Sequence, residues 1–251
     1  MLIDPHLASL LGHGAVSSEI EKAVRKDSGA RFYKAALQVN PFPYATRHAK
    51  NLSYKTESEY NAAIVASCLK NGIEVVGLTD HFRVATSKSL ADALTAVEIE
   101  VFIGFEASSS EGIHVLCFLP RETSLEELER HLGAYGITDL AAESPQSNKT
   151  CEQLLDLVAA HNGVAICAHA CSASGILMTL KGQARARTWR SPQLLAIGLP
   201  GARDAVPENC RQIIANKDPA SARDRPVAVV NANDVYLPDS LSSQARPLGS
   251  K

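Results

Sequence analysis

The sequence lacks the features that mark membrane, secreted and disulfide-rich proteins. No apolar run approaches the roughly 20 residues of a membrane span. The amino-terminal MLIDPHLASLLGHG has no basic flank before its short apolar stretch, so it is a poor secretory signal. The six cysteines form no C-x-x-C pair, and most lie in apolar runs, as reduced buried cysteines do. We therefore expect a cytoplasmic protein without a membrane segment.

The chain also lacks a large net charge and the common nucleotide-binding motifs. A net charge of −2 over 251 residues gives no general attraction to nucleic acid or to a membrane surface. No G-x-G-x-x-G turn follows the first predicted strand, which disfavours an open, doubly wound sheet. No G-x-x-x-x-G-K-[ST] loop occurs either, so the chain carries no nucleoside triphosphatase of its own.

Strand and helix patterns alternate from residue 31 onward. Short apolar runs predict strands at 33–39, 73–78, 99–105, 114–119, 164–168, 194–197 and 227–230. Runs with helical periodicity predict helices at 56–69, 90–97, 124–132, 151–160 and 207–215. This order predicts an α/β protein with a parallel sheet closed into a barrel. The predicted organisation is a helical prefix at 1–30 with Ser17 as a cap, a single barrel domain at 31–242 and a tail at 243–251.

Polar side chains gather where the predicted strands end or begin. Glu106 follows the run VFIGF, and His114 opens the run HVLCFL. Asp80 and His81 follow IEVVGLT, and His169 follows GVAICA. Each could be an isolated polar residue at the rim, but strand ends of a parallel barrel lie on one face, which favours a shared site. Carboxylate and imidazole together are a common ligand set for zinc, manganese or iron.

Four motifs in sequence order resemble those of the PHP (polymerase and histidinol phosphatase) family. They are GLTDHF, GFEASSSEGIHVLCF, ICAHA and VVNANDVYLPDSL, and the resemblance covers about residues 31–242. It implies a distorted (β/α)7, TIM-like barrel that binds divalent metal ions and cleaves phosphoesters. The sequence of these motifs is most similar to that of PHP modules fused to ATPases of the structural-maintenance (SMC/AAA-like) type. Such modules occur in tRNA-processing and phage-defence proteins. That likeness implies an ATPase partner and a role in phage defence.

The resemblance also implies roles for particular residues. The residues that match metal ligands of the family are His81, Glu106, His114, His169 and Asp234. The catalytic group would be Glu106 with His81 and Asp80, where Asp80 either orients His81 or binds a metal itself.

Two motifs depart from the family pattern. The first should read H-x-H, but Gln38-Val39-Asn40 stands there, and the last should end D-x-H, where this chain has Asp234-Val235-Tyr236. Amide oxygens bind these metals more weakly than imidazole does, so Gln38 and Asn40 are expected to be weak ligands. We therefore expect one or two divalent ions per chain. Tyr44 and His48 are expected in a loop that faces the site, with His48 as a substitute ligand.

One basic cluster, KGQARARTWR, follows the strand that ends at His169. Lys181, Arg185, Arg187 and Arg190 are its charged residues, and together with an aromatic they suit phosphate or single-stranded nucleic acid. A solvated surface loop is the equal alternative. The sequence thus predicts a phosphoesterase acting on a phosphoester substrate, including a nucleic acid or nucleotide. The alternatives are a non-catalytic binding or regulatory module that works with an ATPase, and a metal hydrolase of the amidohydrolase type.

Overall fold

Seven strands form one mixed sheet, and the candidate metal ligands lie in its strands or in the segments directly after them. The computed structural model describes residues 33–137, 139, 141, 142, 144–199 and 206–244, so the predicted helix near Ser17 lies outside the described residues. The strands are β1 Ala35–Val39, β2 Val75–Leu78, β3 Glu100–Ser108, β4 His114–Phe118, β5 Val164–Cys167, β6 Ala196–Leu199 and β7 Ala228–Asn231.

The sheet is nearly closed into a barrel. The strands follow one another in the order β1 to β7. The chain after β7 then returns to β1, where Val235 donates to Gln38 O at 2.9 Å and accepts from the amide of Asn40 at 3.0 Å. The predicted α/β barrel, a distorted (β/α)7 TIM-like fold, is confirmed by this arrangement.

One strand runs against the others. β4 pairs antiparallel with both β3 and β5, whereas the remaining pairs are parallel, so the expectation of an all-parallel sheet is wrong at β4. The connection from β3 to β4 consists only of residues 109–113, which is too short for a helical crossover. As a result, the start of β4 lies at the same edge of the sheet as the ends of β3 and β5.

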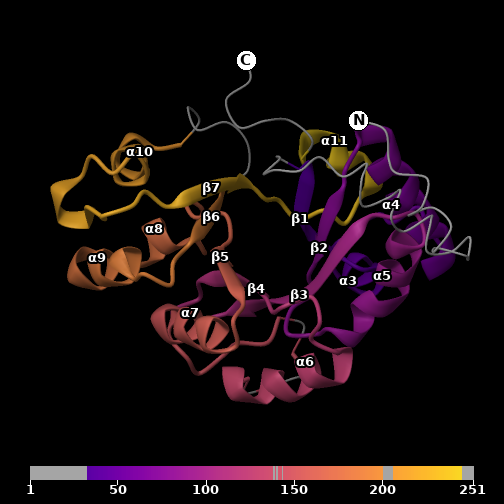
Figure 1. Cartoon of the computed structure of the whole chain (residues 1–251), viewed down its shortest axis with the longest axis horizontal. Helices are drawn as coiled ribbons and strands as arrows, with labels where there is room; N and C mark the ends of the chain where they lie inside the picture. Colours follow the sequence, from indigo (N-terminus) through magenta and orange to yellow (C-terminus); the bar gives the residue numbers. More distant parts are fainter. Residues whose placement is uncertain (1–32, 138, 140, 143, 200–205, 245–251) are drawn as a thin grey trace, which may run out of the picture. The chain divides into compact units, whose positions relative to one another are not determined.

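The helices lie on the outer side of the curved sheet (Figure 1). They are α3 Phe42–His48, α4 Glu57–Asn71, α5 Lys88–Thr95, α6 Leu125–Leu132, α7 Cys151–Ala160, α8 Ile176–Thr179, α9 Gly182–Arg190, α10 Glu208–Ile214 and α11 Leu241–Gln244. Side-chain caps begin several of them, and Ser124 accepts from the amide of Glu127 at the start of α6. Among the described residues, none of the helices combines the length and the apolar character needed to span a membrane.

Phe118 fills the interior of the barrel below the candidate site. Its ring lies over Gly77 and Gly104, where an added Cβ would come within 2.7 Å and 2.6 Å of ring carbons. Neither position has room for a larger side chain without displacing the ring. Leu116 and Ile166 complete this apolar layer. The polar residues at the edge of the barrel therefore rest on a closed hydrophobic floor.

Candidate metal centre

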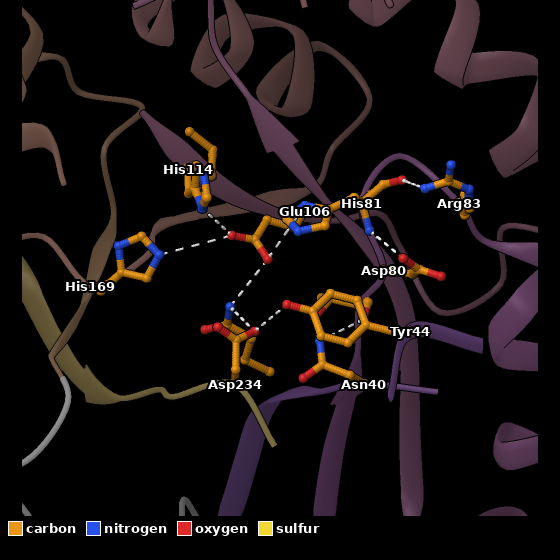
Figure 2. Close-up of polar contacts among 12 residues, drawn as sticks. Asn40, Tyr44, Asp80, His81, Arg83, Glu106, His114, His169 and Asp234 are labelled. Atoms are coloured by element: carbon orange, nitrogen blue, oxygen red, sulfur yellow. Dashed lines mark hydrogen bonds and ion pairs between the residues drawn. The ribbon is translucent and has the colours of Figure 1, made fainter. Parts of the chain in front are cut away.

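The hairpin of β3 and β4 brings a carboxylate and an imidazole to one face of the sheet. Glu106 and Ser108 are two residues apart in β3 and point to the same side, and Ser108 pairs with His114. Glu106 and His114 are therefore diagonal cross-strand neighbours. Their side chains meet, with His114 Nδ1 2.6 Å from Glu106 Oε1 (Figure 2).

A tight turn after β5 adds a second imidazole at the same carboxylate oxygen. His169 Nε2 lies 3.9 Å from Glu106 Oε1, and His169 has a φ of 31°, in the left-handed region that few non-glycine residues adopt. Gly175 makes the turn possible, because an added Cβ there would lie 2.4 Å from the carbonyl oxygen of His169. Ser172 Oγ contacts His169 Nδ1 at 2.8 Å, which fixes the ring and leaves Nε2 facing Glu106.

Burial and the nearby imidazoles determine the charges at the site. Burial alone would raise the pKa of Glu106, but the hydrogen bond from His114 and the charges of the histidines hold this pKa below its usual value. Burial would lower the pKa of His114, but the hydrogen bond to Glu106 and the negative charges of Glu106 and Asp234 together outweigh burial and raise the pKa. Burial lowers the pKa of His81 and of His169. Both of these rings are therefore neutral near neutral pH and can offer a lone pair.

Glu106, His114 and His169 fit a divalent metal ion. Within the described parts of the chain, they are the one group of three or more His, Cys, Asp or Glu side chains whose ligand atoms all lie within 4.8 Å of one another. Bonds of about 2.0–2.2 Å place two ligands of one zinc ion within roughly 4.4 Å of each other, so small side-chain movements suffice. Glu106 is 1% exposed, whereas His114 and His169 are 26% and 19% exposed, which opens the site to solvent on the imidazole side.

Gln38 links Glu106 to the predicted ligand Asp234. Its side-chain nitrogen donates to Glu106 Oε2 at 3.2 Å and to Asp234 Oδ1 at 2.9 Å. The hydroxyl of Tyr44 also donates to Asp234 Oδ1, at 3.3 Å. Burial and the charge of Glu106 raise the pKa of Asp234 to about 6. The structure thus brings both predicted residues to the site, but Gln38 presents its amide nitrogen there, which cannot bind a metal.

Asp80 is bound by donors from the protein. Its buried carboxylate forms an ion pair with Arg47, and it accepts hydrogen bonds from the amide of His81 at 2.7 Å and from the hydroxyl of Thr86 at 3.0 Å. The ring of His81 lies with Nδ1 4.0 Å from Glu106 Oε2, and that nitrogen has no hydrogen-bond partner in the described chain. Asp80 therefore positions His81 through its backbone and leaves the ring nitrogen facing the site.

Helix α3 stands where the sequence predicts a loop. Tyr44 and His48 lie on this helix, and the ring centroid of each is 5.4 Å from that of His81. Both residues therefore approach the site as expected, whereas the prediction of a loop is wrong. Asn40, just before the helix, donates from Nδ2 to the carbonyl of Thr79 at 3.0 Å, while its Oδ1 is buried without a hydrogen-bond partner among the described residues.

The basic cluster is spread along α9. Arg187 Nε forms an ion pair with Glu152 Oε2 at 2.8 Å. Arg190 lines a surface cavity of ≈ 540 Å³ together with residues that precede β6 and β7. Because β5, β6 and β7 are parallel, this cavity lies at the opposite edge of the sheet from His169. Lys181 is exposed and Arg185 is partly buried. A substrate-binding role for these four residues stays a prediction.

Two residues at the site were not predicted from the sequence. Arg47 has no motif to mark it, and only its helical spacing from Tyr44 indicates that the two share a face. Ser172 lies three residues after His169, a spacing that is compatible with a side-chain contact across a turn but does not require one.

Comparison with known proteins shows the fold. No protein-family model and no curated protein matches the sequence. A crystal structure of a protein described as a metal-dependent phosphoesterase, from Bifidobacterium adolescentis, matches with 12% identity and a TM-score of 0.53, covering 88% of this chain and 92% of that chain. The lesion-specific endonuclease PfuEndoQ from Pyrococcus furiosus matches with 13% identity and a TM-score of 0.57, and the match covers 86% of this chain and 50% of that chain.

A third structure, of Endonuclease Q with a 27-mer duplex substrate that has an abasic lesion at the active site, matches with 14% identity and a TM-score of 0.50, covering 68% of this chain and 43% of that chain. The chain therefore spans about half the length of the two endonuclease chains. This chain shares its fold with a protein described as a metal-dependent phosphoesterase and with two endonuclease structures.

Proposed function

We propose that this chain is a metal-dependent phosphoesterase of the PHP type and that Glu106, His114 and His169 hold its metal ion. The observation that carries the proposal is the convergence of two imidazoles on one buried carboxylate, with ligand atoms within 4.8 Å of one another. The fold, shared with a metal-dependent phosphoesterase and with endonucleases, supports the same reaction class.

Each residue of the site contributes a distinct property. A divalent ion, when bound, supplies Lewis-acid polarisation of a phosphoryl oxygen and lowers the pKa of water. Glu106 contributes a negative charge that solvent screens little, since the side chain is 1% exposed. Ser172 holds His169 in the orientation that faces Glu106. His81 is neutral, and its free Nδ1 is placed to accept a proton beside Glu106.

The substrate class we propose is a phosphodiester of a nucleic acid. Two of the structures with this fold are endonucleases, and one of them holds a 27-mer duplex substrate. The exposed cations along α9 would meet a polyanion of this kind. Partnership with an ATPase, a role in phage defence and a cytoplasmic location stay predictions from the sequence.

Chelation followed by metal replacement tests the proposed reaction. We expect purified protein to hydrolyse bis-(p-nitrophenyl) phosphate or a labelled oligonucleotide, to lose this activity after dialysis against a chelator, and to recover it with zinc, manganese or iron. A preparation dialysed without chelator is the control. Absence of hydrolysis with every metal and substrate would instead favour a non-catalytic binding module.

Replacing the arginines of α9 tests their role in binding substrate. We expect the triple change of Arg185, Arg187 and Arg190 to alanine to weaken binding of single-stranded DNA about tenfold or more at low salt, with a smaller loss at high salt. A matched control removes three exposed cations elsewhere, Lys55, Lys70 and Lys217. Equal binding by the α9 variant and the control variant would exclude a specific role for α9.

A further inference from the structure

The two oxygens of Glu106 have different partners. Oε1 faces two imidazoles, with His114 Nδ1 at 2.6 Å and His169 Nε2 at 3.9 Å. Oε2 instead accepts a hydrogen bond from the amide nitrogen of Gln38 at 3.2 Å, and the imidazole nitrogen on that side, His81 Nδ1, is 4.0 Å away. Only the Oε1 side therefore combines the carboxylate with two imidazoles that converge on one point.

A bulge in β1 directs Gln38 into the barrel. The register of β1 against β2 shifts between Ala36 and Val39. Leu37 packs in the interior layer with Phe118, and the next residue, Gln38, also reaches the interior because it contacts Glu106. In a regular strand these two neighbours would point to opposite faces. The bulge thus places a fully buried amide between two carboxylates.

The orientation of this amide follows from its neighbours. Glu106 Oε2 and Asp234 Oδ1 both accept hydrogen bonds, and a side-chain NH2 group has two hydrogens to donate. The reverse orientation would set the oxygen of Gln38 against two carboxylate oxygens with no hydrogen between them. Both donors of Gln38 are therefore used, and one hydrogen-bonding group satisfies two acidic side chains.

We propose that the amide of Gln38 stands in for a cation between Glu106 and Asp234, so that this site holds one metal ion per chain. The inference rests on the proposed function, because it assumes that Glu106, His114 and His169 bind that ion. Asp234 then acts as a positioning residue that holds Gln38 and Tyr44, and it is not a metal ligand. A similar arrangement lies nearby, where the guanidinium of Arg47 satisfies the buried carboxylate of Asp80.

Metal content measured by elemental analysis tests this assignment without relying on activity. Each protein is loaded with excess zinc, freed of unbound metal by gel filtration and checked for folding by circular dichroism. We expect one zinc per chain in the parent and in Asp234→Asn, because an amide oxygen at this position can still accept the hydrogen bond from Gln38. We expect a second zinc in Gln38→Glu, because three carboxylates without a donor between them require a cation. Gln183→Glu, at an exposed position on α9, is the matched control and should keep one zinc.

The possible counts separate the failure of this inference from the failure of the proposed function. Two zinc ions in the parent would overturn the inference alone, and so would a folded Asp234→Asn protein that has lost its zinc. A single zinc in folded Gln38→Glu would show that the amide does not occupy a cation's place. No zinc in the parent would overturn the proposed metal site itself. Even if a variant fails to fold, the zinc content of the parent protein separates failure of the inference (two zinc ions) from failure of the proposed metal site (no zinc).

Discussion

Glu106→Gln should remove the bound metal and the phosphoesterase activity together. The amide keeps the shape of the side chain but removes the charge, and Glu106 is the carboxylate on which His114 and His169 converge. Because the loss of a residue that merely supports a metal ligand typically costs 10–100-fold, we expect loss of this ligand to lower turnover by more than about 100-fold. Zinc content and turnover of a generic aryl phosphodiester, measured on the same preparation, check both effects.

An exposed glutamate on α6 provides the control for this change. Glu129→Gln removes one charge from the solvent-exposed side of α6 and should leave metal content and turnover unchanged. His169→Ala should resemble Glu106→Gln, because it removes one of the three proposed ligands. If Glu106→Gln retains both metal and activity, the site has been assigned to the wrong residues.

The sequence predicts the strands and the residues at their ends because both depend on local patterns. Continuous apolar runs predict β2 and β5, and each predicted range overlaps the observed strand. Polar residues directly after such runs are expected near one edge of the sheet, which is why Glu106 and His169 can be grouped from the sequence alone. Their mutual distances then depend only on strand order and direction.

Other features of the site depend on contacts between distant residues. The antiparallel pairing of β4 moves His114 to the edge where β3 and β5 end, and an all-parallel sheet would have placed the start of that strand at the opposite edge. The bulge in β1 changes the face to which Gln38 points, and no turn residue in AALQV marks it. A weak ligand expected from the sequence is consequently a hydrogen-bond donor in the structure.

Arg47 illustrates the same limit for charge pairs. It lies on α3, in a segment whose two prolines and short length gave no helical signal, and its partner Asp80 follows β2. Asp80 is fully buried in the structure, so its charge needs a partner supplied by another part of the chain. Neither the burial nor the partner can be derived from the residues around Asp80 alone.

Arg47→Met should destabilise the protein by about 3 kcal/mol. The change leaves a fully buried carboxylate without its counter-charge, and breaking a buried pair from one side costs about 3–5 kcal/mol. The lower end of this range of energies applies because the side chain of Arg47 is itself 26% exposed. Urea unfolding measures the free energy of unfolding for each variant. Lys88→Met, which breaks the exposed pair with Asp92, is the control and should cost at most about 1 kcal/mol.

The double variant Arg47→Met with Asp80→Asn should recover about 2 kcal/mol of that loss. The neutral amide no longer needs a counter-charge, and its oxygen can still accept the hydrogen bond from the backbone of His81. The difference between the double variant and the sum of the single variants gives the coupling energy of the pair. Equal losses for Arg47→Met and Lys88→Met would mean that the carboxylate of Asp80 is satisfied without Arg47, by the His81 amide and the Thr86 hydroxyl alone.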